Sequence, residues 1–304
     1  MSQPSLSVSL DAVIVRMHNG EPQILAVETP EGPAIPSGPL DPDQDATLEL
    51  ALRRWITEQS GVEIGYAEQL YTFGDLDRGA GAAERGPRWL SVAYLALVRD
   101  AVAAQGAVWL DLYALFPWED RREGPPAVVD TIIVPALETW VGSDVDRRDR
   151  VRVFNATAPD WDGIRVLERY ELMYEAGVVG EALRDRLQPA DDATGGLGVM
   201  MVGDQRRIAA TALGRLRGKL TYRPVVFELL PDTFTLRTLQ STVEALAGVR
   251  LHTQNFRRLV ERTRLVEGTG ERTTATGGRP AELFRFRREV WSERPRPGVG
   301  VPYR

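Results

Sequence analysis

The chain has 304 residues, of which 43% are hydrophobic and 26% charged, which is typical of a globular protein of two domains. It has no cysteine and two histidines, His18 and His252, so disulfides, thiolate nucleophiles and cysteine-ligated zinc are excluded and histidine-based catalysis is disfavoured. Residues 205–304 hold 20 Lys and Arg against 9 Asp and Glu, whereas residues 1–204 hold 17 against 34. A basic end on an acidic body is typical of a polyanion-binding module joined to another domain. No apolar run approaches the roughly 18 residues of a membrane helix, so we expect a cytoplasmic protein.

The first third of the chain predicts a mixed arrangement of strands and one helix. Apolar alternation over 8–15 and 23–28, around a His-Asn-Gly turn, predicts a strand pair. A helix is expected from Asp45, whose side chain would cap the first N–H groups, to the glycine at 61. Its apolar positions recur at helical spacing: Leu48, Leu52, Trp55 and Ile56. Further strands are predicted over 69–74, 90–98 and 107–116.

Residues 119–199 are interpreted as an insertion with one helix over 161–187. Three carboxylates follow that helix at three- and four-residue spacing: Glu168, Glu171 and Glu175. This spacing would suit a metal site, but a solvated acidic face is the favoured interpretation.

The last third predicts a winged helix. An arginine-rich helix over 204–217 precedes two helices over 236–247 and 253–263, which a tight connection at Gly248 joins. Short strands over 265–267 and 282–286 close the segment. Helix, turn, second helix and β-hairpin is the order of a winged helix-turn-helix domain.

The helix over 45–58 lies in a pattern that resembles the box of the Nudix hydrolases. Five positions agree with that box: Arg54, Ile56, Glu58, Gly61 and Val62. Four positions depart from it, since Trp55, Gln59 and Ala46 replace glutamates and Gly38 lies two residues too far upstream. Magnesium demands clustered oxygen ligands, and one surviving carboxylate cannot supply them. We therefore expect no catalytic residue, no metal site and no hydrolysis.

Several separated segments together resemble the NrtR family, the Nudix-related transcriptional regulators of NAD metabolism. They are residues 71–78, 88–94, 216–224, 227–236, 255–258 and 278–281. The resemblance implies an α+β protein in which a Nudix-like α/β/α sandwich with a mixed sheet precedes a winged helix-turn-helix domain. It also implies a homodimeric repressor of NAD biosynthesis or salvage genes that binds a double-stranded DNA operator and requires no cofactor. The implied effector is ADP-ribose, although some members of the family respond to sugar metabolites.

These interpretations divide the chain into four parts. Residues 1–118 form the sensor domain and 119–199 the insertion associated with it. Residues 200–222 form a connecting helix and junction, and 223–304 the winged helix domain.

The second helix of the predicted winged helix carries the candidate DNA contacts. Its first turns would meet base edges in a major groove, where Arg pairs with guanine and Asn or Gln with adenine. The base-reading candidates are Thr253, Gln254, Asn255, Arg257 and Arg258. Arg262 is expected to contact phosphate, and Arg272 and Arg279 lie in the predicted wing. The alternative to DNA reading is that the helix over 253–263 is an ordinary basic surface helix. For Arg279, the alternative to a DNA contact is a structural role in its turn.

The sensor side offers guanidinium groups that suit a diphosphate, and aromatic rings for adenine. The candidates around the former catalytic groove are Arg54, Glu58, Phe73, Asp77, Arg78 and Arg88, with Tyr71 as an alternative stacking ring. Each aromatic taken alone is more typical of the core, and the alternative for Arg54 is that it decorates the exposed side of its helix.

Two other functions remain open at this point. An active pyrophosphohydrolase that splits ADP-ribose would need carboxylates of the insertion to rebuild a metal site. A constitutive architectural DNA binder would leave the large sensor-like domain without a role.

Overall fold

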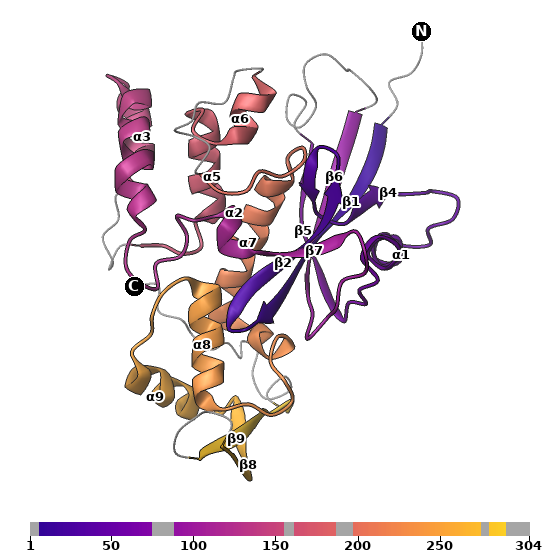
Figure 1. The fold of residues 1–304 in the computed structure, drawn as a ribbon, viewed down its shortest axis with the longest axis vertical. Helices are drawn as coiled ribbons and strands as arrows, with labels where there is room; N and C mark the ends of the chain where they lie inside the picture. Colours follow the sequence, from indigo (N-terminus) through magenta and orange to yellow (C-terminus); the bar gives the residue numbers. More distant parts are fainter. Residues whose placement is uncertain (1–5, 75–87, 155–160, 187–196, 275–279, 290–304) are drawn as a thin grey trace.

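A computed structural model describes residues 6–74, 88–154, 161–186, 197–274 and 280–289 (Figure 1). The strands are β1 (Leu6–His18), β2 (Glu21–Thr29), β3 (Gly32–Ala34), β4 (Ser37–Pro39), β5 (Tyr66–Phe73), β6 (Arg88–Leu97), β7 (Ala107–Asp111), β8 (Val266–Thr273) and β9 (Ala281–Phe286). The helices are α1 (Leu48–Ser60), α2 (Leu112–Leu115), α3 (Val134–Val141), α4 (Val145–Val151), α5 (Val166–Glu175), α6 (Gly180–Asp185), α7 (Gln205–Tyr222), α8 (Leu236–Ala247) and α9 (Thr253–Thr263). Two short helical segments are η1 (Val129–Ile133) and η2 (Val225–Glu228).

A mixed sheet forms the first part of the molecule. Its strand order is β3-β2-β1-β6-β5, with β4 paired to β1 and β7 paired to β2. β1 runs parallel to β6 and antiparallel to β2. The centre of β1 is a continuous run of buried residues, because helices cover both faces of the sheet.

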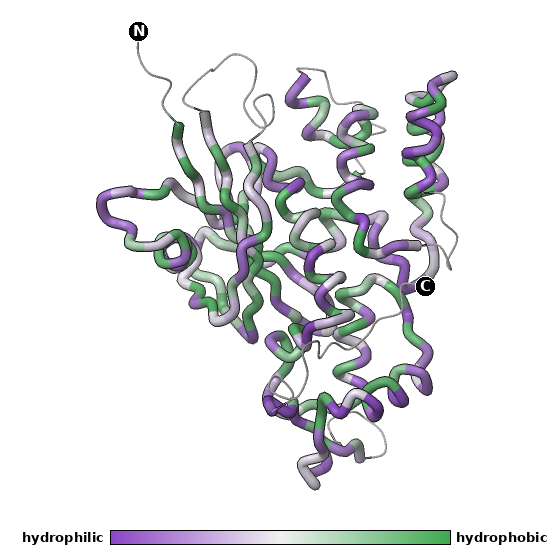
Figure 2. Tube along the Cα trace, turned by 180° about the vertical axis from the view of Figure 1, so that it is seen from behind, coloured by the Kyte–Doolittle hydropathy of each residue, from purple (hydrophilic) through white to green (hydrophobic). Residues whose placement is uncertain are grey.

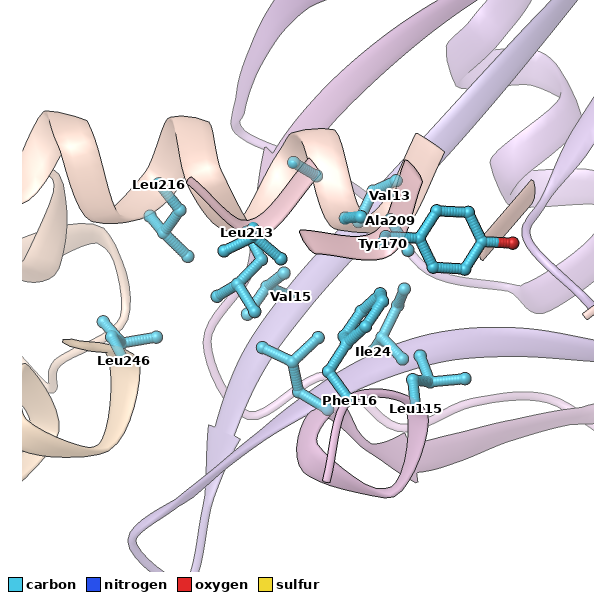
Figure 3. Close-up of a cluster of buried hydrophobic side chains, with 14 of the residues drawn as sticks. Val13, Val15, Ile24, Leu115, Phe116, Tyr170, Ala209, Leu213, Leu216 and Leu246 are labelled. Carbon is cyan, nitrogen blue, oxygen red and sulfur yellow. The ribbon is translucent and has the colours of Figure 1, made fainter. Parts of the chain in front are cut away.

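The two faces of the sheet have separate cores. On one face, Leu10 and Ile14 of β1 pack with Leu52 and Ile56 of α1. On the other face, Val13 and Val15 of β1 and Ile24 of β2 belong to the core that α7 closes (Figure 3). That core continues through Leu213 and Leu216 of α7 to Leu246 of α8 (Figure 3), and Figure 2 shows hydrophobic residues along the strands. The predicted Nudix-like α/β/α sandwich with a mixed sheet is confirmed.

α8, α9 and the β8–β9 hairpin lie together at one end of the molecule (Figure 1). The two helices have the bounds that the sequence predicts, because both of their ends carry local signals. The Thr235 hydroxyl accepts from the Thr238 amide and caps α8, and Gly248 ends it with φ 73°. Phe256 and Val260 bury one face of α9, so the winged helix prediction is confirmed.

Three local predictions are wrong. The cap of α1 is Thr47 rather than Asp45, because Asp45 lies two residues too early and accepts from the Asp41 amide instead. The strand predicted over 107–116 ends at Asp111, whose carboxylate accepts from the Tyr113 amide and starts α2. The single helix predicted over 161–187 is two helices, since Gly177 between them adopts φ 73°.

Candidate nucleic-acid interface and sensor groove

α9 presents a polar, cationic face to solvent. Thr253, Gln254, Asn255, Arg257 and Arg258 are all exposed, whereas Phe256 is only 3% exposed. Arg262 is also exposed on the last turn. Among the residues that the structure describes, the arginines at 257, 258 and 262 have no carboxylate within ion-pair distance, so their charges are available to an external anion.

The turn between α8 and α9 is held by two side chains of α8. The Glu244 carboxylate accepts from the Leu251 amide at 3.0 Å and from Gln240 Nε2 at 2.8 Å. Gln240 Nε2 also donates to the Leu251 carbonyl at 3.0 Å. Because Glu244 is only 6% exposed, these bonds are shielded from water and fix the start of α9 relative to α8.

The wing is anchored by aromatic rings. Phe286 of β9 stacks on Phe227 of η2 with ring centroids 4.3 Å apart, and Phe234 lies 5.6 Å from the same ring. Arg272 of β8 is exposed at the far end of the hairpin, opposite Glu282. Arg279 lies outside the described residues.

Trp55 and Gln59, which replace Nudix glutamates, hold β4 beside the α1 groove, the space that α1 and residues 39–42 border. Trp55 Nε1 donates to the Pro39 carbonyl at 2.9 Å, and its ring packs so closely on Gly38 that a Cβ there would overlap it. Gln59 Nε2 donates to the Ser37 carbonyl at 2.7 Å, while its Oε1 accepts from the Ser37 amide at 3.0 Å. A carboxylate could not make either donation, so both side chains hold the 37–39 strand against α1.

An open hollow of about 580 Å³ remains beside α1, lined by Pro39–Pro42, Gln44, Arg54, Trp55 and Glu58. The Arg54 guanidinium is paired there with Asp45 at 3.0 Å and with Glu58 at 3.7 Å, and it lies 4.6 Å from the Trp55 ring centroid. Asp45 is almost completely buried in this pair. An anionic ligand would therefore compete with two carboxylates for Arg54.

Of the remaining sensor candidates, Phe73 lies at the opposite face of the sheet. Phe73 is 5% exposed and belongs to the core, with the Arg207 guanidinium 5.3 Å from its ring centroid, whereas Tyr71 is 64% exposed. Arg88 begins β6, and Asp77 and Arg78 lie outside the described residues. The structure thus brings Arg54 and Glu58 together but places Phe73 apart from them.

The three glutamates of α5 are paired with arginines. Glu168 pairs with Arg165, Glu171 with Arg207 on α7, and Glu175 with Arg150. Within the described part of the chain, no three acidic or histidine side chains are placed to hold a metal ion.

A buried ionic cluster, which the sequence did not predict, lies between the sheet and the winged helix. The Glu119 carboxylate pairs with Arg169 at 2.6 Å and with Arg217 at 2.6 Å, and all three side chains are 0% exposed. Trp161 lies between Arg121 and Arg169, with 3.6 and 3.7 Å from its ring centroid to the guanidinium carbons. The partners of Glu119 lie 50 and 98 residues away, so no local pattern signals them.

Two buried carboxyls have pKa values shifted in opposite directions. Burial raises the pKa of Glu119, but the adjacent Arg169 and Arg217 outweigh burial, so the pKa lies below its ordinary value. Asp11 of β1 has neutral partners, among them Ser91 Oγ at 2.5 Å, and burial raises the pKa of this carboxyl.

Comparison with known proteins adds to this geometry. Residues 226–286 match a family model described as the NrtR DNA-binding winged helix domain. The match covers the winged helix, 61 of the 304 residues. The resemblance to the NrtR family that the sequence predicts is thereby confirmed.

The similarity to relatives extends beyond that domain. The chain is 22% identical over 288 residues to the ADPR responsive transcriptional repressor NtrR of Acinetobacter baylyi, covering 93% of this chain and 83% of that protein. A crystal structure of Shewanella oneidensis NrtR complexed with a 27mer DNA aligns with a TM-score of 0.56 and 21% identity, over 94% of this chain and 95% of that one. A MutT/nudix family protein from Enterococcus faecalis aligns with a TM-score of 0.54 and 14% identity, over 94% and 88%. No helix in the described part of the chain is long and apolar enough to span a membrane.

Proposed function

We propose that this chain is a cytoplasmic transcriptional repressor of NAD biosynthesis or salvage genes, which binds an operator through α9 and releases it when the Nudix-like domain binds ADP-ribose. The observation that carries the proposal is the exposed cationic face of α9 within an NrtR winged helix domain. The repressor of Acinetobacter baylyi is described as ADPR responsive, which supports the choice of effector.

We further propose that the Nudix-like domain is not an enzyme. Trp55 and Gln59 occupy carboxylate positions of the box and make the bonds to Pro39 and Ser37 instead. The four-part division of the chain, with boundaries at 118, 199 and 222, and a homodimeric assembly belong to the same proposal.

The DNA part is tested by gel-shift titrations on operator and scrambled duplexes over a series of salt concentrations. Loss of one bidentate base contact costs about 1–3 kcal/mol, so Asn255→Ala and Arg257→Ala should relax sequence preference by roughly 5- to 150-fold. Arg262→Ala should weaken binding to all sequences alike and reduce the salt slope by about one. Arg152→Ala, an exposed arginine outside the winged helix, is the matched control. Wild-type operator binding by a folded Asn255→Ala, Arg257→Ala double variant would show that α9 is not the reader.

The effector part is tested by isothermal titration and a hydrolysis assay. ADP-ribose should bind the protein, and Arg88→Ala should weaken that binding. In the hydrolysis assay, the protein with magnesium or manganese should release no AMP from ADP-ribose. Turnover of about 1 per second or faster that Glu58→Gln abolishes would support the rival hydrolase instead. Failure of every diphosphate nucleotide to bind would direct the search to sugar phosphates.

A further inference from the structure

The N-terminal end of α7 is bonded to residues 35–37, which directly precede the residues 39–42 that line the α1 groove. Gln205 Oε1 accepts from the Ile35 amide at 2.8 Å. Two residues later, Gln59 of α1 holds both backbone groups of Ser37, as described above. Residues 35–37 are therefore held by α1 from one side and by α7 from the other. A movement of this segment cannot leave both bonded partners in place.

The last turn of α8 is bonded to the second half of α7, to α2 and to the segment that follows α2. Arg217 Nε donates to the Leu246 carbonyl at 3.1 Å, and Tyr113 Oη donates to the Ala245 carbonyl at 2.6 Å. The Arg121 amide donates to the Gly248 carbonyl at 2.7 Å. The last carbonyls of a helix lack partners within the helix, and here residues outside the winged helix supply them.

Glycine is required where these parts meet. A Cβ on Gly248 would overlap the Glu119 carbonyl oxygen and lie 2.6 Å from a terminal nitrogen of Arg217. Tyr113 belongs to α2, Glu119 follows α2 in the chain, and Arg217 belongs to α7. The winged helix therefore contacts the buried ionic cluster directly at Gly248.

The helix between these two ends is closely packed. α7 has 18 residues, which at 1.5 Å per residue is about 27 Å. Ala209, Leu213 and Leu216 lie in the core shown in Figure 3. On its other side, a Cβ on Gly214 would lie 2.6 Å from the Ile164 carbonyl oxygen. A helix packed on both sides moves as a unit rather than bending.

We propose that α7 couples the α1 groove to the winged helix, with Gln205 of α7 and Tyr113 of α2 as positioning residues at the two contacts. This inference rests on the proposed function, because it names the route by which the effector changes DNA affinity. Ligand binding that displaces residues 35–37 shifts α7 through Gln205. The shift moves the cluster of Glu119, Arg217 and Tyr113 under α8 and so reorients α9. Coupling of this kind is a free energy shared between two sites and is reciprocal.

The test measures the ratio of DNA dissociation constants with and without saturating ADP-ribose, by fluorescence anisotropy on the full chain. Wild type should show a ratio in the range of about 5- to 150-fold. Gln205→Met removes the bond to the Ile35 amide, Tyr113→Phe removes the bond to the Ala245 carbonyl, and both keep side-chain volume. Each should reduce the ratio by about fivefold, the scale of one hydrogen bond, while ADP-ribose affinity of the DNA-free protein stays within about twofold. The reciprocal ratio, ADP-ribose affinity with and without DNA, should fall equally.

Tyr174→Phe is the matched control, because it removes a tyrosine hydroxyl that donates to Asp185 at 2.8 Å and connects α5 to α6. It should leave the ratio at the wild-type value. Wild-type coupling in Gln205→Met and Tyr113→Phe, or equal loss in Tyr174→Phe, would overturn the role of α7 and leave the proposed function intact. A wild-type protein that binds DNA but ignores ADP-ribose would overturn the proposed function and this inference with it.

Discussion

Replacing Glu119 by alanine would leave two guanidinium groups in the protein interior without their carboxylate. Arg169 and Arg217 are each 0% exposed and each lie 2.6 Å from Glu119, so water cannot take the place of the lost partner without opening the core. Removing one member of a buried ion pair typically costs about 3–5 kcal/mol. For a chain of 304 residues, an unfolding entropy of about 2.1 cal/mol/K per residue converts this cost to a fall in Tm of roughly 5–8 °C.

Thermal unfolding of the variant and of wild type at several pH values checks this expectation. Because the folded-state pKa of Glu119 lies below its ordinary value, its contribution is complete above an ordinary pKa of 4.5 and is lost as the pH falls through the lowered value. The difference in Tm should therefore be largest near pH 7 and should narrow in acid. A fall of less than about 2 °C at pH 7 would refute the reasoning, since it would mean that both arginines find other partners.

A variant without charges in the Glu119 cluster separates the effect of ion pairing on stability from the effect of burying these side chains. Buried ion pairs can often be replaced by apolar side chains of similar volume without loss of stability. The triple variant Glu119→Leu, Arg169→Met, Arg217→Met should therefore recover part of the stability that Glu119→Ala loses. If it is less stable than Glu119→Ala, the hydrogen bonds of the arginines to backbone carbonyls matter more than the charges.

Three further predictions concern stability. Burial raises the pKa of Asp11, so in wild type the stability present below its ordinary pKa of 3.8 is lost as the pH rises through the raised pKa. In urea titrations, Asp11→Asn should therefore raise the unfolding free energy by about 1 kcal/mol at pH 8 and should give no gain below pH 3.8. Gly38→Ala should cost about 1–3 kcal/mol, because its Cβ displaces the Trp55 indole, and a shifted tryptophan emission maximum should accompany the loss. Thr235→Ala should cost about 1 kcal/mol by removing the cap of α8, and Thr235→Ser should restore it in the same urea titration.

The winged helix could be predicted from the sequence because its signals are local. The bounds of α8 follow from Thr235 at one end and Gly248 at the other, and the apolar spacing of α9 places Phe256 and Val260 in the core. The strand pair at the start of the sheet follows from alternation and a tight turn for the same reason.

What the sequence could not supply depends on long-range contacts. Asp45 does not cap α1 because its carboxylate accepts from the Asp41 amide and pairs with Arg54, nine positions away. Whether Phe73 is a ligand contact or a core residue is decided by α7, whose Arg207 lies more than a hundred positions away in the chain. The glutamates of α5 look alike in the sequence, yet Glu171 pairs with α7 and Glu168 with its own helix.

The substitutions in the Nudix box also have a structural consequence beyond the loss of carboxylates. A glutamate at position 59 would place a second acceptor against the Ser37 carbonyl, where the amide of Gln59 now donates. A glutamate at position 55 could not donate to the Pro39 carbonyl, and it would vacate the space over Gly38. The two side chains therefore fasten β4 to α1, and Gln205 of α7 accepts from the Ile35 amide two residues before that strand. Side chains at two positions that carry metal-binding glutamates in the Nudix box here hold β4 against α1.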